Sequence, residues 1–384
     1  MVEYSVSFVL GTRPEIIKTA PVVLECARRG VQAEVIHTGQ HYSERLDGVF
    51  FEQLGLPPSS CNLRVGSKPH GEQTGEMLTK VERRLLETEP DIVFVQGDTN
   101  STLAGGLAAS KLDTDVAHIE AGLRSFDREM PEETNRVLVD HLSEYLFAPT
   151  ESAAAELRRE NIPDSRITVT GNTVVDAIER YGKIAVAESD VLDRLDLEPG
   201  RFCLLTAHRS ENVDDRGRFE SLLDGVDRYA RRINTEVVYP VHPRARKQLE
   251  TFDISVPETV RLVEPLDFFD FLCLENEARL VFTDSGGVQE ETCILGTPCV
   301  TLRYNTERPE TVHVGANCIA GVSPSEIVLA GEQMDGKRGN WEMPFGDGRA
   351  SERILDTLTL EDAPASEVEA RGRREQLVSS EKQY

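Results

Sequence analysis

The chain has 384 residues, and its 67 acidic residues outnumber 42 basic ones, giving a formal net charge of -25 at pH 7. This length is about twice that of a typical domain, so we expect two domains. So acidic a surface repels phosphate backbones, which excludes nucleic acid as an expected partner. No apolar run approaches the ~18 residues that span a bilayer, so no membrane partner is expected either.

Composition also predicts the compartment. Only eight of the 42 basic residues are lysines, and such an acidic, lysine-poor surface favours a halophilic protein over an ordinary acidic cytosolic one. The seven cysteines are odd in number and show no CxxC spacing, which is typical of reduced thiols. Residues 1–10 are apolar but few, and they contain Glu3, so they predict a first strand rather than a signal peptide. We therefore expect a cytoplasmic protein.

Strands and helices alternate along the first half. The predicted elements are strand 5–10, helix 14–29, strand 31–37, helix 77–86, strand 92–95, helix 101–111, strand 116–119, helix 131–145 and strands 146–148 and 167–169. This alternation predicts a parallel sheet with helices on both faces.

The pattern restarts after residues 170–173, which we expect to form a hinge. The second half is predicted to contain helix 174–186, strand 202–206, helix 219–232, strands 237–240, 261–263 and 280–283, helix 288–295 and strand 299–302. We therefore expect an α/β protein of two Rossmann-like, doubly wound domains with a cleft between them. The predicted limits are 1–170 for the first domain and 171–360 for the second, followed by a polar tail over 361–384.

Acidic residues follow the buried strands of the first half. Asp98 comes after strand 92–95, and Glu120 comes after strand 116–119. Glu132 lies just after Pro131, in the first turn of a helix, where it could pair with Arg136 four residues on. Strand ends of this kind face the ligand crevice of a parallel sheet, and carboxylates there can act as acids or bases. On its own, the Glu132 pattern is more typical of a stabilised helix start.

Two turns are candidate phosphate sites. Gly11 to Glu15 follow the first strand and open a helix, so free N–H groups, Arg13 and Lys18 could meet an anion there. A plain turn with a solvated Arg13 is the equally weighted alternative.

The second candidate turn lies in the other half. Ser285 could cap a helix, and Gly286 and Gly287 would let a pyrophosphate approach it. A glutamate one turn on could accept hydrogen bonds from ribose hydroxyls. The alternative is a capped helix whose first-turn glutamates favour the helix dipole. A GxGxxG fingerprint is absent from the sequence, which argues against NAD as a cofactor.

Two histidines follow strands of the second half. His208 could stabilise or protonate a departing phosphate, and His242 could do so or equally could cap a loop. The eight histidines form no close ligand pair in the sequence, so no metal site is expected.

Together these motifs resemble the non-hydrolysing UDP-N-acetylglucosamine 2-epimerase family from residue 11 to about residue 358. The matching runs are GTRPE at 11–15, TGQH at 38–41, GDT at 97–99, EAGLR at 120–124, PEETNR at 131–136, TGNT at 170–173, HRSE at 208–211, YPVH at 239–242, DSGGVQEE at 284–291, GTPC at 296–299 and TERPE at 306–310.

The resemblance implies a glycosyltransferase-B fold and inversion at carbon 2, which converts UDP-N-acetylglucosamine to UDP-N-acetylmannosamine. The family is thought to eliminate UDP, leaving a glycal, and then to add UDP back with the proton on the other face. The resemblance implies no redox cofactor or metal, and it implies a homodimer. It matches Asp98, Glu120 and Glu132 to catalytic carboxylates, His208 and Arg13 to groups at the leaving phosphate, and Ser285, Gly286 and Glu291 to phosphate and ribose contacts.

Some runs depart from many bacterial members. Residues 40–44 lack the sequence that contributes to an allosteric site in those members. The loop over 124–131 is also shorter than theirs. Residues 71–75 and 100–111 resemble relatives that act on UDP-2,3-diacetamido-2,3-dideoxy-glucuronate, which is an alternative substrate. A glycosyltransferase or hydrolase on the same fold, and a silent nucleotide-sugar binder, are the competing functions.

The net charge predicts a response to salt. Molar KCl screens the repulsion among surface carboxylates, so the unfolding temperature should rise from dilute buffer to molar KCl. Differential scanning fluorimetry measures it, with a neutral osmolyte as the control for general stabilisation. An unfolding temperature that does not change with KCl would contradict the halophile interpretation.

Overall fold

The computed structural model describes residues 4–40, 50–57, 61–112, 114–128 and 130–359. His41 of the TGQH run, most of the 40–44 departure and the predicted tail over 361–384 lie outside the described residues.

The first half of the chain builds a seven-stranded sheet whose neighbouring strands are all parallel, in the order β3-β2-β1-β4-β5-β6-β7. The strands are β1 (Ser5–Leu10), β2 (Gln32–His37), β3 (Cys61–Asn62), β4 (Ile92–Gln96), β5 (Asp115–Ile119), β6 (Tyr145–Ala148) and β7 (Ile167–Val169). The helices are α1 (Arg13–Arg29), α3 (His70–Thr88), α4 (Asn100–Lys111), α5 (Pro131–Leu142) and α6 (Glu151–Arg159), with a 3-10 turn over Asp164–Arg166.

Buried aromatic rings hold the centre of this sheet. Phe8 of β1 stacks on Phe94 of β4 with ring centroids 4.7 Å apart, and Phe94 in turn stacks on Phe147 of β6. The strand order reverses between β1 and β4, and a crevice opens beyond the carboxyl ends of strands at such a point. The loops after these two strands therefore face a ligand site.

The second half builds a six-stranded parallel sheet in the order β10-β9-β8-β11-β12-β13. Its strands are β8 (Phe202–Thr206), β9 (Glu236–Pro240), β10 (Val260–Val263), β11 (Leu280–Thr283), β12 (Cys299–Thr301) and β13 (Asn317–Ile319). Its helices are α8 (Val191–Arg194), α9 (Ser210–Val213), α10 (Arg216–Ile233), α11 (Pro243–Thr251), α12 (Phe268–Glu277), α13 (Gly286–Leu295), α14 (Pro309–His313) and α15 (Pro324–Met334). Here the order reverses between β8 and β11.

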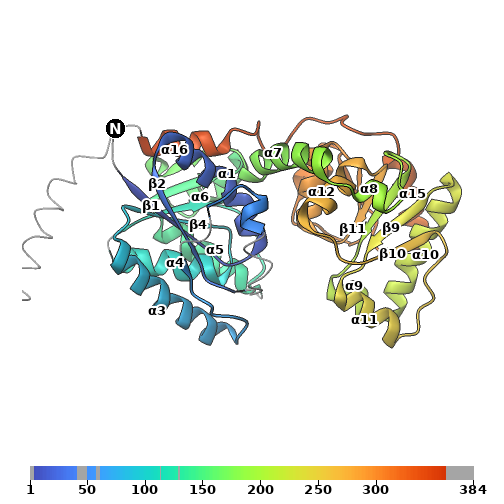
Figure 1. The fold of residues 1–384 in the computed structure, drawn as a ribbon, viewed down its shortest axis with the longest axis horizontal. Coiled ribbons are helices and arrows are strands. Elements are labelled where there is room, and N and C mark those ends of the chain that lie inside the picture. The colour runs from blue at the N-terminus through green and yellow to red at the C-terminus, as the bar shows by residue number, and fades with distance from the viewer. Residues whose placement is uncertain (1–3, 41–49, 58–60, 113, 129, 360–384) are drawn as a thin grey trace, which may run out of the picture.

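Two helices join the lobes. Helix α7 (Thr173–Glu188) packs against α1 of the first lobe and against α12 and α13 of the second, and Figure 1 shows it bridging them. Helix α16 (Ala350–Thr359) returns to the first lobe, where Asp356 pairs with Arg29 of α1. Asp176 of α7 accepts hydrogen bonds from the first two N–H groups of α16. The predicted domain limits at 170 and 360 stay a prediction.

The predicted fold class, two Rossmann-like α/β units, is confirmed, but some helix limits were wrong. Helix α5 ends at Leu142, not at residue 145, because the N–H of Glu144 bonds to Val116 and draws the chain into β6. Helix α3 begins at His70, seven residues before the prediction, because the polar residues of its first turns hide the apolar period. The side chain of Gln73 is buried there and bonds to the carbonyl of Gly66.

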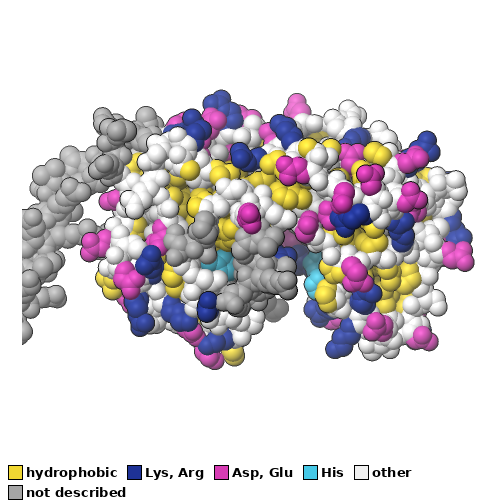
Figure 2. All heavy atoms as spheres, in the orientation of Figure 1, with side chains coloured by type: hydrophobic (Ala, Val, Ile, Leu, Met, Phe, Trp, Pro, Cys, Tyr) yellow, Lys and Arg dark blue, Asp and Glu magenta, His cyan; other side chains and the backbone are white. Residues whose placement is uncertain are grey.

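Acidic and basic side chains are scattered over both lobes rather than segregated (Figure 2). Many form ion pairs along helix surfaces, such as Arg228 with Asp224 and Arg231 with Asp227. No helix within the described part of the chain is long and apolar enough to cross a membrane.

Candidate active site

A cavity of about 1160 Å³ lies where the carboxyl ends of both sheets meet. Its lining comes from the loops after β1, β4, β5, β8, β11 and β12 and from the starts of the helices that follow them. Among its lining residues are eight of the predicted site residues: Lys18, Asp98, Glu120, Glu132, Arg136, Ser285, Gly287 and Glu291. The structure therefore brings the predicted carboxylates of one lobe to the predicted phosphate turn of the other.

Glu120 is the buried anion at the centre of the cavity. Its carboxylate accepts a hydrogen bond from Lys18 Nζ at 2.6 Å and one from Asn172 Nδ2 at 2.9 Å, and it also accepts from Gln96. Burial alone would raise the pKa of Glu120, but Lys18, Arg308 and these hydrogen bonds hold it below its ordinary value. Glu120 therefore stays ionised despite being buried.

The partner of Glu120 also reaches the other lobe. Lys18 Nζ lies 3.6 Å from Glu290 of α13, and Arg308 pairs with Glu290 at 2.8 Å. Burial would lower the pKa of Lys18, but Glu120 and Glu290 raise it above its ordinary value. A buried chain of alternating charges therefore crosses the cleft.

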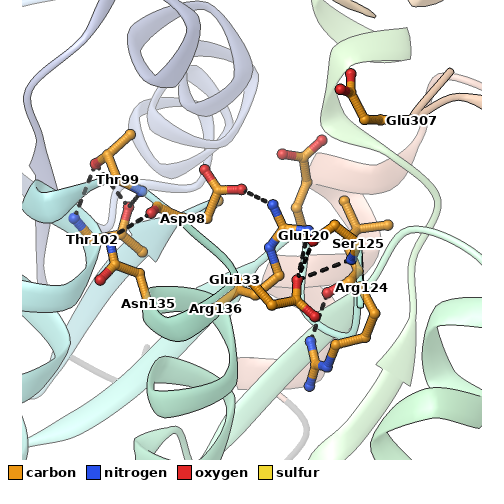
Figure 3. A network of polar contacts seen from close by, with 12 residues as sticks. Asp98, Thr99, Thr102, Glu120, Arg124, Ser125, Glu133, Asn135, Arg136 and Glu307 are labelled. Atoms are coloured by element: carbon orange, nitrogen blue, oxygen red, sulfur yellow. Dashed lines mark hydrogen bonds and ion pairs between the residues drawn. The ribbon is translucent and has the colours of Figure 1, made fainter. Parts of the chain in front are cut away.

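Asp98 is tied to helix α5. Arg136 donates to the Asp98 carboxylate and lies 3.3 Å from Glu133, while Asn135 donates to the Asp98 carbonyl at 2.9 Å (Figure 3). The predicted pairing of Arg136 with Glu132 is wrong. Asp98 stands across the strand end and Glu133 lies three residues before Arg136 on the helix, and both draw the guanidinium away from Glu132.

Glu132 lines the cavity and has no fixed side-chain partner, by hydrogen bond or ion pair, among the described residues. Its neighbour Glu133 is instead fixed, accepting from the N–H and hydroxyl of Ser125 at 2.9 Å each and from the N–H of Phe126. Burial would raise the pKa of Glu133, but these bonds and Arg136 lower it below its ordinary value.

Glu15 holds the turn after β1, and Arg13 is solvated, as in the second predicted alternative. The Glu15 carboxylate accepts from the N–H of Gly11 and from the hydroxyls of Thr12, Thr99 and Thr102, so it joins this turn to the one after β4. Burial raises the pKa of Glu15 above its ordinary value, although these hydrogen bonds lower it in part. Arg13 is exposed, lies over the ring of Phe50 and is outside the cavity lining.

The N-terminus of α13 opens on the cavity. Ser285 occupies the N-cap position, but its side chain makes no capping hydrogen bond, so the predicted cap is wrong in that respect. A Cβ at Gly286, which lies just outside the cavity lining, would come within 3.2 Å of Glu307 Oε2. Glu307 in turn bonds to Arg303, which also pairs with Glu211 at 2.8 Å. The Arg303–Glu307 pair therefore lies next to the N-terminus of α13.

The two histidines lie side by side at the edge of this region, outside the cavity lining, with ring centroids 5.6 Å apart. The N–H groups of His208 and Arg209 donate to Asp284, which is fully buried. Burial would raise the pKa of Asp284, but the contacts from His208 lower it below its ordinary value. His242 Nδ1 accepts a hydrogen bond from the N–H of Arg244 and caps α11. Capping was one of the two predicted roles of His242. Burial, with His208 nearby, lowers the pKa of His242.

A second buried carboxyl stands behind the predicted ribose ligand. Burial raises the pKa of Glu291 from 4.5 to about 6, with a hydrogen bond from Glu275 opposing it and Glu290 adding to it. Burial and the charge of Glu291 raise the pKa of Glu275 well above its ordinary value. Both carboxyls are therefore easier to protonate than an ordinary glutamate side chain.

Sequence reasoning missed several residues of the site. Glu15, Asn172, Asp284, Glu290 and Arg308 all lie within the matched motifs, but nothing in their local spacing shows a partner on another loop. Gln96, Glu133 and Arg303 likewise find their partners only through the fold. No group of three or more His, Cys, Asp or Glu side chains in the described ranges is placed to hold a metal ion.

Comparison with known proteins gives consistent matches along the chain. A family model described as UDP-N-acetylglucosamine 2-epimerase matches residues 24–359. A UDP-N-acetylglucosamine 2-epimerase from Methanocaldococcus jannaschii is 49% identical, over 92% of this chain and 98% of that protein. A UDP-N-acetylglucosamine 2-epimerase from Methanococcus maripaludis is 46% identical, over 94% of this chain and 100% of that protein.

The architecture is likewise shared with a solved structure. The crystal structure of the Methanocaldococcus jannaschii enzyme in complex with UDP-GlcNAc and UDP superimposes with a TM-score of 0.82 at 49% identity, covering 92% of this chain and 99% of that one. The sequence-predicted glycosyltransferase-B type of fold is confirmed by this likeness.

The shifted pKa of Glu291 predicts a pH dependence of stability. Because its folded pKa, about 6, lies above the unfolded value of 4.5, its contribution is present below pH 4.5 and lost as the pH rises through 6. A Glu291→Gln variant does not titrate. Relative to the wild type it should therefore gain about 2 kcal/mol of unfolding free energy between about pH 4.5 and about pH 7.5.

Urea unfolding at the two pH values measures this gain, and Glu82→Gln, at an exposed position of α3, is the control. An equal difference between Glu291→Gln and wild type at both pH values would show that Glu291 ionises normally.

Proposed function

Because the chain belongs to the UDP-N-acetylglucosamine 2-epimerase family, we propose that it interconverts UDP-N-acetylglucosamine and UDP-N-acetylmannosamine by inverting carbon 2 of the sugar. The observation that carries the proposal is the meeting of Asp98, Glu120 and Glu132 with the N-terminus of α13 in one cavity. A base and a phosphate site on opposite walls are what the elimination and re-addition of UDP require.

The chemistry divides into two balanced steps. In the first, a base removes the proton from carbon 2, the bond between carbon 1 and the phosphate oxygen breaks, and UDP and a glycal form. In the second, the phosphate oxygen adds back to carbon 1 while an acid delivers a proton to the other face of carbon 2. Both steps need a positioned acid or base and a cationic site for the leaving diphosphate.

Glu132 is suited to carry a proton. Glu120 forms an ion pair with Lys18, and Asp98 forms one with Arg136. Each of these carboxylates would have to break its ion pair before it could exchange a proton. Glu132 lines the cavity with no such partner among the described residues. We assign proton transfer on one face of carbon 2 to Glu132, and proton transfer on the opposite face to Asp98 or Glu120, which also line the cavity.

The second lobe would hold the diphosphate and the nucleoside. At the start of α13, where an anion is favoured, Ser285 and Gly287 line the cavity and Gly286 lies just outside the lining. Lys18, Arg303 and Arg308 supply positive charge nearby, and His208 stands behind them. Glu291 would accept hydrogen bonds from the ribose hydroxyls, whereas Arg13 and His242 lie outside the cavity lining and are assigned no role in this proposal.

The competing substrates and reactions are less well supported. Relatives 46–49% identical to this chain are UDP-N-acetylglucosamine 2-epimerases, so a diacetamido-uronate substrate is not favoured. A glycosyltransferase or hydrolase would use an acceptor or water in place of the returning UDP. Each alternative gives a product that the experiment below distinguishes.

Three further properties belong to the same proposal. We place the enzyme in the cytoplasm, as a homodimer, in a salt-rich cell. The acidic, lysine-poor composition supports the salt-rich setting, and the reduced, mostly buried cysteines support the cytoplasm. The dimer rests on the family resemblance.

The reaction is tested by proton NMR of the purified protein with UDP-N-acetylglucosamine in deuterated, KCl-rich buffer. We expect the manno epimer to appear with deuterium at carbon 2, because the proton is lost to a carboxylate that exchanges with solvent.

Other outcomes would contradict the proposal. An epimer that retains its original hydrogen would exclude proton loss to an exchanging group. Free sugar or a new glycoside with UDP would indicate the hydrolase or transferase, and turnover of the diacetamido-uronate alone would reassign the substrate.

Substitution of each of the three carboxylates should reduce turnover, to different extents. Glu132→Gln should reduce kcat by about 10²- to 10⁴-fold, the usual contribution of a general acid or base. Asp98→Asn and Glu120→Gln should also reduce turnover, while circular dichroism shows a folded protein. Glu156→Gln is the matched control, because Glu156 lines the same cavity but pairs with Arg159. Near-normal turnover in one of the three variants would remove that residue from the machinery.

A further inference from the structure

A histidine that the reaction does not use lies buried beneath the site. The His118 side chain on β5 is fully buried, and its Nδ1 lies 2.7 Å from Asp140 Oδ1 on α5. Its Nε2 lies 2.8 Å from the carbonyl oxygen of Gly97. A carboxylate and a carbonyl can only accept, so these two contacts assign a donor role to both ring nitrogens of His118.

Asp140 binds the residues on both sides of Glu120. Its Oδ1 accepts from His118, and its Oδ2 accepts from the N–H of Gly122 at 3.1 Å and pairs with Arg124 at 2.7 Å. Burial would raise the pKa of Asp140, but His118 and Arg124 lower it below its ordinary value, so the carboxylate is ionised. Glu120 itself has a φ of 67°, a left-handed conformation that is uncommon for a glutamate. The residues that flank this strained position are therefore fixed to one carboxylate.

The same ring fixes the turn that carries Asp98. Gly97 has a φ of 70°, its N–H bonds to the carbonyl of Ile119 at 3.0 Å, and its own carbonyl accepts from His118. Both polar groups of the Gly97 backbone are thus bound to β5, and Asp98 follows directly.

We propose that the hydrogen-bonded His118–Asp140 pair is a positioning element that sets the backbones of both Asp98 and Glu120, and this rests on the proposed roles of those two carboxylates. His118 lies outside the cavity lining, so it cannot touch the substrate and acts only through the two loops. A misplacement of catalytic groups of about 1 Å can cost about 10²-fold in rate.

The first variant is His118→Asn, whose shorter amide keeps a donor toward Asp140 and loses the donor to Gly97. We expect kcat to fall by about 10²-fold, while KM for UDP-N-acetylglucosamine changes by less than about twofold because the second lobe holds the nucleotide. Glu160→Gln is the matched control. It weakens the outer partner of Arg124 in the same network, at 2.7 Å, and should leave kcat within about twofold.

The second variant is Asp140→Asn, which can keep every hydrogen bond with one charge of each sign removed. Its amide donates to Nδ1 of a neutral imidazole while Nε2–H still reaches Gly97. We expect it to retain much more activity than His118→Asn. Nitrogen-15 NMR of labelled histidine should show two protonated ring nitrogens for His118 in the wild type and one in Asp140→Asn.

The outcomes separate the two proposals. A wild-type protein without epimerase activity would overturn the proposed function, while the NMR signature of His118 would still test the ion pair. An unchanged kcat in His118→Asn would overturn the positioning role, and a wild-type His118 with only one protonated ring nitrogen would overturn its pairing as a cation with Asp140. If His118→Asn does not fold, the proposal is tested by the NMR signature of His118 and by the activity of Asp140→Asn.

Discussion

The need to pair one buried carboxylate organises the cleft. Glu120 ends a central strand, so its charge is removed from water, and an unpaired buried charge costs several kcal/mol. Lys18 meets this need from the first turns of α1, and Asn172 adds a hydrogen bond from the junction between the lobes. The pair therefore fixes the helix after β1, the end of β5 and the start of α7 relative to one another.

The charge chain continues into the second lobe through Glu290 and Arg308, so the lobes are coupled by the same groups that line the cavity. A ligand diphosphate would enter a cleft whose cations already have acidic partners. Arg303 pairs with Glu211 and Glu307, and both carboxylates are partly exposed. Breaking an ion pair with an exposed carboxylate costs little free energy, so Arg303 can turn from these partners to a phosphate. Breaking the buried Glu120–Lys18 pair would cost much more.

Where a polar or charged side chain follows a buried strand, the sequence predicted residues that the structure brings together in one cavity. Short apolar runs predicted the strands β4, β5, β8 and β11, and their carboxyl ends placed Asp98, Glu120 and Ser285 in one cavity. The partners of these residues could not be read in the same way. Arg136 turns to Asp98, 38 positions away, and not to Glu132, because a contact across the strand end prevails over helical spacing. The buried link from Asp140 to His118 spans 22 positions and leaves no periodic signal.

A strongly acidic protein can hold a nucleotide diphosphate because the repulsion and the binding act over different distances. The Debye length is about 3 Å in molar salt, so the field of the exposed carboxylates scarcely reaches a ligand in the cleft. Lys18 and Arg308 contact their partners directly in a buried setting, where salt screens little. High salt therefore removes the repulsion that a net charge of -25 would exert on UDP and leaves the short-range contacts in place. The cleft is therefore compatible with the salt-rich setting that the composition predicts.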